Sequence, residues 1–286
     1  MKVIKNLIVL VFTVCMTFSC STDSIPVERE VSVIKPLEAK TLLDISYGNH
    51  SEQVYDIYLP ADRTIDTKVL LLVHGGGWTS GDKMDMNGFK DFMLNELPDV
   101  AVVNINYRLA DKNNLPHPMQ INDLSAVVKD LNDKNEEYVI SADLGFMGVS
   151  AGGHLSLLYS YAYDTEDQVK MVCSIVGPTN FLDTAYQDTT NPLQKELLDF
   201  FGYNQGLMQE ASPLFQVEAS APPTILFYGG QDPLIPVSQG IDLAAKLTEL
   251  NIVHEFTLYE NEGHGWNGSN LLDTSIKLKT FIEQHL

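Results

Sequence analysis

The sequence predicts an α/β fold, a single domain in which a mostly parallel central sheet has helices on both faces. Strand-like and helix-like segments alternate from about residue 42 to the C-terminus, as they do in chains of βαβ units. The runs KVLLLV and VAVVNI are almost continuously apolar, which is typical of strands buried on both faces. Glycines or polar residues follow these runs, where a buried strand has to leave the sheet.

The expected elements follow one another without an internal repeat. A first strand starts near Leu42, and alternating apolar and polar side chains predict a half-buried strand over residues 53–60. Apolar runs predict further strands within residues 68–77, 100–108, 144–150, 169–177, 224–230 and 254–261. Helical patterns predict helices within residues 119–131, 153–163, 191–202, 240–250 and 274–285.

Residues 178–220 interrupt this alternation after the sixth major strand. They are irregular apart from one helical stretch, NPLQKELLDFFG, and lack the extended apolar helices of a lipase lid. We expect this insertion to form a short cap over the C-terminal edge of the sheet. The predicted domain as a whole covers residues 42–286.

The chain is strongly acidic. It has 286 residues, with 18 Lys and Arg against 38 Asp and Glu, so its formal net charge is −20. Nucleic-acid binding depends on Lys and Arg contacts to phosphates, so this balance excludes a nucleic acid as partner. It equally disfavours adsorption to anionic lipid. The hydrophobic share of 44% is that of a globular protein with a sizeable core.

The first 19 residues have the pattern of a secretory signal peptide. Lys2 and Lys5 precede an apolar run from Leu7 to Phe18. Twelve helical residues span only about 18 Å, whereas a hydrocarbon core is about 30 Å thick. We therefore expect an export signal rather than a membrane span, although an uncleaved N-terminal anchor remains an alternative.

Two processing routes stay open after this signal. TFSC followed by STDS resembles the lipobox of bacterial lipoproteins, in which Cys20 becomes the lipidated first residue, although Thr17 stands where Leu is usual. Lipidation predicts a lipoprotein that faces the periplasm or lies on the outer-membrane surface, with residues 20–41 as a polar tether. Conventional cleavage before Cys20 predicts a soluble secreted protein instead. The membrane is therefore expected to be a partner only through the N-terminal lipid anchor.

Cys173 is the one cysteine outside this N-terminal region. It lies within the apolar run VKMVCSIVG and is expected to be a small core residue. A disulfide within the domain is therefore not expected, although export leads to a compartment in which disulfides form.

A candidate nucleophile stands where a strand meets a helix. Gly148-Val149-Ser150-Ala151-Gly152-Gly153 follows the apolar run from Leu144 and precedes a helical pattern. A serine on such a sharp turn leaves no room for side chains two positions away, and glycine also tolerates the unusual backbone angles. The G-x-S-x-G pattern in this context therefore predicts that Ser150 is a nucleophile.

A serine nucleophile needs a base and an acid that orients the base. Of the histidines beyond the turn and its helix, His254 begins a strand and His285 ends the last helix. His264 instead lies in a loop after a strand, in ENEGHGWNG, and is the predicted base. Asp232 follows the buried run TILFYGGQ at the same edge of the sheet, with prolines that stiffen its loop, and is the predicted acid.

The motif His74-Gly75-Gly76-Gly77-Trp78 follows another buried strand. Attack on an ester places negative charge on the carbonyl oxygen, and fixed N–H donors lower that barrier. Glycines let backbone N–H groups approach the oxygen, so Gly76 and Gly77, with the amide of Ala151, are the predicted oxyanion hole. We expect His74 to brace this loop through a hydrogen bond rather than to act as a second base.

These four motifs, in this order, resemble the α/β-hydrolase superfamily. More narrowly, they are similar to the HGGG-bearing esterases related to hormone-sensitive lipase and to bacterial feruloyl or acetyl-xylan esterases. The resemblance covers roughly residues 42–286 and includes Asn106-Tyr107-Arg108-Leu109 and Asp123. It implies structural roles for Arg108 and Asp123, and a serine esterase that acts on short-chain or carbohydrate-linked esters of the acetyl or feruloyl type.

Other readings of the same motifs stay open. The HGG-x-W loop also occurs in arylformamidases, so an amide hydrolase, including a prolyl-oligopeptidase-like exopeptidase, is the first alternative. A catalytically inactive fold that binds a partner is the second. Trp78 and Trp266 adjoin the motifs, and line the substrate pocket or pack beneath the loops. No H-E-x-x-H or His/Cys cluster predicts a metal or cofactor, and the acidic charge favours neutral esters.

Overall fold

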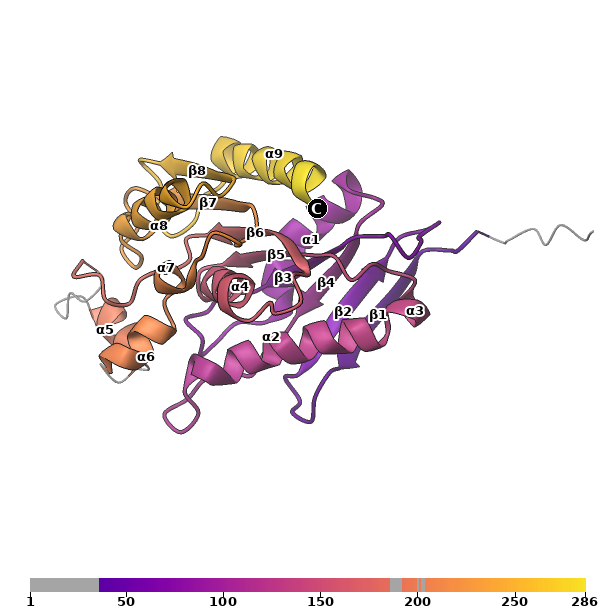
Figure 1. The fold of residues 1–286 in the computed structure, drawn as a ribbon, viewed down its shortest axis with the longest axis horizontal. Coiled ribbons are helices and arrows are strands. Elements are labelled where there is room, and N and C mark those ends of the chain that lie inside the picture. Colours follow the sequence, from indigo (N-terminus) through magenta and orange to yellow (C-terminus); the bar gives the residue numbers. More distant parts are fainter. Residues whose placement is uncertain (1–35, 186–191, 200, 202–203) are drawn as a thin grey trace, which may run out of the picture. The chain divides into compact units, whose positions relative to one another are not determined.

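The computed structural model describes residues 36–185, 192–199, 201 and 204–286, within which eight strands form one sheet (Figure 1). The strands lie in the order β1-β2-β4-β3-β5-β6-β7-β8. Their bounds are β1 Lys40–Ser46, β2 Val54–Leu59, β3 Val69–Val73, β4 Ala101–Ile105, β5 Leu144–Val149, β6 Val169–Ile175, β7 Thr224–Gly229 and β8 His254–Tyr259. β2 is antiparallel to β1 and β4, and all other neighbouring pairs are parallel, which confirms the mostly parallel sheet.

The N-terminal predictions lie outside the described residues. These are the signal peptide over residues 1–19, lipidation at Cys20 and most of the tether. The described residues belong to one compact unit, Pro36–Leu286. Within them, no helix is both long enough and apolar enough to cross a membrane.

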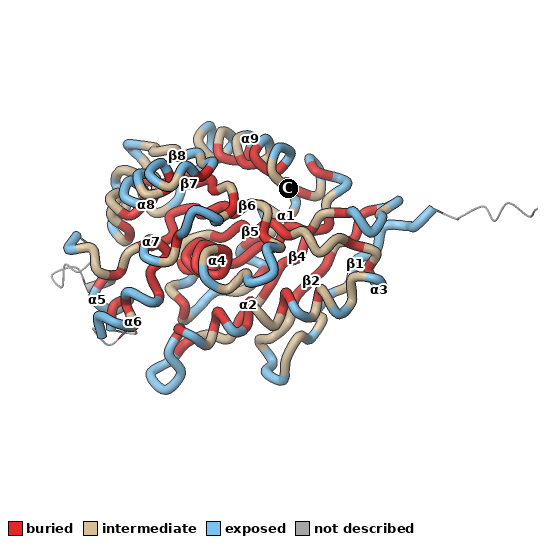
Figure 2. Tube along the Cα trace, in the orientation of Figure 1, coloured by how far each residue is buried: buried red, intermediate tan, exposed pale blue. Residues whose placement is uncertain are grey.

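Helices cover both faces of the sheet. Their bounds are the 3₁₀-helix η1 Lys83–Met86, then α1 Asn87–Glu96, α2 Pro116–Asp133, α3 Asn135–Tyr138, α4 Ala151–Ala162, α5 Pro192–Asp199, α6 Gln205–Glu210, α7 Pro213–Gln216, α8 Ser238–Glu249 and α9 Gly268–His285. Alternate side chains of β3 point to the two faces of the sheet. Leu71 and Val73 belong to the core cluster that includes residues of α2, α4 and α8, and Leu70 and Leu72 belong to the cluster that includes residues of α1 and α9. All four are fully buried. In Figure 2, the central strands of the sheet are mostly red, the colour of buried residues.

Several element boundaries differ from the sequence expectation. β1 begins at Lys40, inside the stretch expected to be tether, because this edge strand is mostly exposed and carries little hydrophobic pattern. α1 was not predicted at all, since Met93 is its one buried residue. α9 begins at Gly268 rather than Thr274, because its polar first turn gives no apolar period.

The described part of the insertion packs beside α4. α7 contacts both α4 and α8, and Leu214 donates its N–H to the carbonyl of Thr179 at 3.0 Å. Nε2 of His154, on α4, lies 2.7 Å from the carbonyl oxygen of Ala211. In Figure 1, α5 and α6 lie on the same side of the sheet as α4. These contacts hold the insertion against the flank of α4.

A buried ion pair ties the end of β4 to α2. The carboxylate of Asp123, 1% exposed, accepts the backbone N–H of Arg108 at 2.8 Å and its guanidinium at 2.5 Å. It also accepts the side-chain amide of Gln53 at 2.8 Å. Burial costs the carboxylate its hydration, and these donors replace it. The structure thus places Arg108 and Asp123 where the resemblance implied, in the framework of the fold.

We expect Asp123→Ala to lower the free energy of unfolding by about 2–3 kcal/mol, because it leaves a partly buried guanidinium without its partner. Asp133→Ala, on the same helix, is the matched control. Asp133 is exposed and pairs only with Lys129 one turn away, so its loss should cost less than about 0.5 kcal/mol. Urea denaturation of the three proteins measures both values, and equal costs would contradict the structural role of Asp123.

Candidate active site

Ser150 lies on the sharp turn between β5 and α4. Its φ of 54° and ψ of −120° lie outside the favoured regions, a conformation that costs about 1–3 kcal/mol. The flanking glycines make room for this turn. A Cβ on Gly148 would lie 2.1 Å from the carbonyl oxygen of Gly152, and a Cβ on Gly152 would lie 2.1 Å from that of Val73. The glycine spacing therefore follows from direct contact with backbone.

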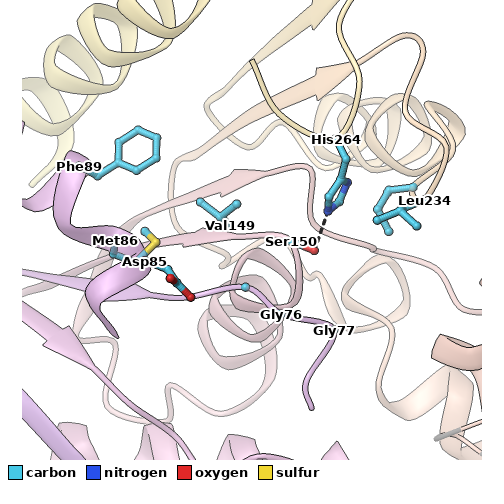
Figure 3. Close-up of a pocket in the computed structure, with 11 residues that line it drawn as sticks. Gly76, Gly77, Asp85, Met86, Phe89, Val149, Ser150, Leu234 and His264 are labelled. Carbon is cyan, nitrogen blue, oxygen red and sulfur yellow. Dashed lines mark hydrogen bonds between the residues drawn. The ribbon is translucent and has the colours of Figure 1, made fainter. Parts of the chain in front are cut away.

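His264 and Asp232 form a hydrogen-bonded chain with Ser150. Figure 3 shows the hydrogen bond between Ser150 and His264. Oγ of Ser150 lies 2.9 Å from Nε2 of His264, and Nδ1 of His264 lies 2.7 Å from Oδ2 of Asp232. The Asp232 side chain is 1% exposed, and its Oδ1 accepts the N–H groups of Leu234 and Ile235 at 2.8 and 3.0 Å. Asp232 is thus held rigidly and orients the imidazole so that Nε2 faces the serine hydroxyl.

Two loops that are 32 residues apart bring this acid and this base together. Gly229, at the end of β7, lies so close to the loop after β8 that a Cβ there would be 2.1 Å from the carbonyl oxygen of Gly263. Gln231 donates its N–H to the carbonyl of Glu262 at 2.8 Å. Since these contacts flank Asp232 and His264, the absence of a side chain at Gly229 lets the two loops meet.

The Gly-rich loop after β3 presents free N–H groups beside Ser150. Gly76 and Gly77 have φ of 106° and 57°, and a Cβ on Gly76 would lie 2.0 Å from the carbonyl oxygen of Ser80. Among the described residues, the amides of Gly76, Gly77 and Ala151 donate to no other group. Gly76 and Gly77 line the same pocket as Ser150, and Ala151 is the first residue of α4. The three predicted oxyanion donors are therefore unpaired among the described residues, and two of them line the pocket with Ser150.

Buried side chains brace this loop from below. The ring of His74 stacks on Tyr107, with centroids 4.2 Å apart, and its Nδ1 lies 2.7 Å from the carbonyl oxygen of Gly75. Burial lowers the pKa of His74, so the ring stays neutral, as a bracing role requires. Tyr107 donates its hydroxyl to the carbonyl of His74 at 2.8 Å, and Gln120 donates its amide to that of Trp78 at 2.7 Å. The sequence did not predict this role of Gln120, because a glutamine on a helix gives no sign of which backbone group it will contact.

Trp78 and Trp266 do not line the pocket, so that prediction was wrong and the packing alternative holds. Trp78 is 1% exposed, donates Nε1–H to Nδ1 of His154 at 3.2 Å, and packs edge-on against Phe181 and Phe201. Trp266 is 9% exposed and donates Nε1–H to the hydroxyl of Thr274 at 2.8 Å. Both indoles turn inward and anchor the catalytic loops to the core.

The pocket above Ser150 has a volume of about 490 Å³ (Figure 3). Asp85, Met86 and Phe89 form one wall, and Leu234 and Ile235 form the other beside His264. None of the described residues of the insertion lines this pocket, so they do not provide the expected cover over the catalytic end of the sheet. Sequence reasoning missed the first wall because η1 and α1 carry no strong pattern.

Two further features concern the lone cysteine of the domain and the possibility of a metal site. Cys173 is fully buried in β6, and burial raises the pKa of its thiol, so it is a core residue as predicted. In the described part of the chain, no three His, Cys, Asp or Glu side chains come together as a metal site would require.

The chain resembles known proteins over most of this domain. The BD-FAE family model matches residues 55–247. A probable carboxylic ester hydrolase, LipM of Mycobacterium tuberculosis, is 29% identical over 228 residues, which are 73% of this chain and 52% of that protein. Kynurenine formamidase of Salmo salar is 26% identical over 160 residues, which are 54% of this chain and 52% of the relative. The chain thus spans about half the length of these curated relatives.

A solved structure shows the same fold. A truncated carbohydrate esterase from gut microbiota superposes with a TM-score of 0.72 at 19% identity, covering 87% of this chain and 97% of that chain. This likeness confirms the predicted α/β-hydrolase fold.

We expect Gly152→Ala to destabilise the protein by about 2–3 kcal/mol, because its Cβ would meet two carbonyl oxygens of the β3 loop within 2.4 Å. Gly88→Ala is the control. Gly88 also lies in a helix, but a Cβ there meets nothing within 4 Å, so alanine should stabilise by about 0.5–1 kcal/mol. Thermal melts compare the two variants, and a neutral Gly152→Ala would refute the backbone contact.

His154 should make stability sensitive to acid. Burial lowers its pKa from 6.5 to about 3, so the folded chain keeps it neutral while the unfolded chain binds a proton. Above pH 6.5, His154 makes its full contribution to the free energy of unfolding. This contribution falls by about 1.4 kcal/mol per pH unit as the pH drops toward 3. Urea titrations between pH 7 and 4 measure the free energy of unfolding of wild type and of His154→Gln. The difference between the two values should shrink at that rate below pH 6.5. A constant difference would contradict a neutral buried imidazole.

Proposed function

The chain belongs to the BD-FAE family, and we propose that it is a serine ester hydrolase that acts through an acyl-enzyme on Ser150. One observation carries the proposal: the hydroxyl of Ser150 lies 2.9 Å from a histidine that a buried carboxylate orients, beside unpaired backbone N–H groups. Serine is a weak nucleophile at its ordinary pKa, and such a neighbour is what activates it.

The proposed reaction has two steps. His264 accepts the proton of Ser150 as Oγ attacks the carbonyl carbon, and the oxyanion forms beside the amides of Gly76, Gly77 and Ala151. His264 then gives that proton to the departing alcohol as the ester C–O bond breaks. Water attacks the acyl-enzyme, His264 takes its proton and returns it to Oγ, and the acid leaves. Asp232 stabilises the imidazolium throughout.

The proposed substrates are short-chain or carbohydrate-linked esters of the acetyl or feruloyl type. Apolar walls next to Ser150 and a volume of about 490 Å³ suit an acyl group of this size. A relative named as a carboxylic ester hydrolase and a structural neighbour named as a carbohydrate esterase support the same class. The acidic charge of the chain favours neutral substrates over polyanionic ones.

Amide hydrolysis is the second candidate, and one finding favours it specifically. A relative named kynurenine formamidase aligns over 160 residues of the chain. The same serine, histidine and aspartate would serve this reaction, with an amine as leaving group. Rates on acetyl esters, methyl ferulate, aminoacyl amides and N-formyl aromatics, measured side by side, separate the two candidates.

We also keep the proposal that the protein is exported and anchored through Cys20. It rests on the lipobox-like TFSC after a short apolar run. Cys20→Ala in the full chain should move the protein from the membrane fraction to the soluble fraction. A variant that stays in the membrane fraction would favour an uncleaved anchor, and a wild type that is already soluble would favour soluble secretion.

We expect Ser150→Ala to lower kcat for p-nitrophenyl acetate by at least about 10⁴-fold, because the acyl-enzyme can no longer form. Ser160→Ala is the control, since its buried hydroxyl lies on the same helix and bonds only the carbonyl of Ser156. The control should keep kcat within about threefold of wild type. Retained turnover in purified Ser150→Ala would refute the nucleophile, whereas wild type without turnover would leave an inactive binding fold as the alternative.

A further inference from the structure

A second hollow adjoins the catalytic pocket. It lies between α1 and α9, has a volume of about 400 Å³ and has Phe92 and Leu271 in its apolar lining. Asp85 and Phe89 line both this hollow and the pocket above Ser150. A substrate that reaches from one hollow into the other therefore passes these two side chains.

Among the residues that the structure describes, Asp85 and His264 are the acidic or basic side chains that line the two hollows. It belongs to the capping box that starts η1, and its Oδ2 accepts the backbone N–H of Asp82 at 3.0 Å. This bond fixes the carboxylate and leaves Oδ1 available. In Figure 3, the carboxylate lies near Gly76, on the side of the pocket away from Leu234.

No cation neutralises Asp85 among the described residues. The neighbouring Lys83 directs its ammonium to Asp44 and Asp56, both at 2.5 Å, and Lys90 pairs with Asp91 at 3.0 Å. Of the titratable groups beneath the loop, His74 is kept neutral because burial lowers its pKa. The Tyr107 hydroxyl keeps its proton because burial, with a contribution from the charge of Asp85, raises its pKa. The negative charge of Asp85 therefore acts on whatever enters the pocket.

We propose that Asp85 is a specificity-determining residue that accepts a hydrogen bond from a ring hydroxyl of the substrate and rejects a carboxylate at that position. The proposal rests on the ester hydrolase function proposed above. A carboxylate beside an aromatic ring suits a hydroxylated ring, because Phe89 offers an apolar face while Oδ1 accepts the hydroxyl proton. The same chemistry would serve a phenol or a sugar ring.

Solvent limits the size of the effect. Asp85 is exposed, so water and salt screen its charge, and a substrate carboxylate about 5 Å away should lose about tenfold in kcat/KM. A carboxylate also lacks the proton that the hydroxyl donates, which adds to the same preference. High ionic strength should weaken the rejection of the anion and leave the hydroxyl preference over a neutral methoxy group.

The test uses two matched triads of esters. In one, para-hydroxy-, para-methoxy- and para-carboxycinnamate methyl esters place the group on the acyl side. In the other, acetates of para-hydroxy-, para-methoxy- and para-carboxybenzyl alcohol place it on the alcohol side. A third arm, acetylated para-nitrophenyl xyloside with its deoxy analogue, separates a sugar hydroxyl from a phenol.

We expect wild type to favour the hydroxyl over the carboxylate member by about tenfold in at least one triad, and Asp85→Asn to remove most of that preference. Asparagine keeps an oxygen for the N–H of Asp82, so η1 should remain folded, which circular dichroism checks. Asp91→Asn is the control for net charge: it lies on α1, lines neither hollow and should keep the wild-type ratio.

A ratio that Asp85→Asn changes by less than twofold in every arm would overturn the assignment. If wild type hydrolyses none of these esters, the proposed function has failed rather than the subsite. The same ratios are then measured as dissociation constants by titration calorimetry on Ser150→Ala and on the double variant with Asp85→Asn. If Asp85→Asn changes the ratio of the dissociation constants, the result supports the subsite. If it leaves that ratio unchanged, the result overturns the subsite.

Discussion

The site depends on one close backbone contact, between the start of α4 and the end of β3. Gly152 lies so near the carbonyl oxygens of Val73 and His74 that a Cβ would be within 2.4 Å of both. Any other residue would push the helix away from the sheet. Because this contact closes the turn, Ser150 is held at a strained backbone angle and stands next to the Gly-rich loop that follows β3. The same close contact therefore places both Ser150 and the Gly-rich loop with its unpaired N–H groups.

A second close approach of two backbone segments positions His264. Gly229 and Gly230 let the loop after β8 lie directly against the end of β7, which brings His264 to Asp232. Trp266 then ties the His264 loop to α9, just as Trp78 ties the Gly-rich loop to α4 and the insertion. The tryptophans next to the catalytic motifs therefore hold the loops in place, and the pocket walls come from smaller apolar side chains and Asp85.

Few side chains in and around the site carry a charge. Asp232 is buried with both oxygens occupied, so its negative charge acts mainly on His264. His74 and His154 are kept neutral by burial and serve as hydrogen-bonding braces. Asp85 differs, since it is exposed, without a cationic partner among the described residues, and at the junction of two hollows. Of the chain's 38 acidic residues, Asp232 thus lies buried behind His264, and Asp85 lines the pocket.

The sequence by itself determined the parallel sheet, the strand-to-helix turn at Ser150 and the positions of His264 and Asp232, because each is encoded locally. Continuous apolar runs mark buried strands, and glycines mark the places where backbone meets backbone. The sequence did not determine α1, the support from Gln120, the inward turn of Trp78 and Trp266, or the wall at Asp85. Each of these depends on which surfaces face each other once the chain has folded. The sequence pattern of a polar helix such as α1 is the same whether the helix faces solvent, core or pocket. The same holds for an indole beside a motif, so only tertiary packing decides which surface it faces.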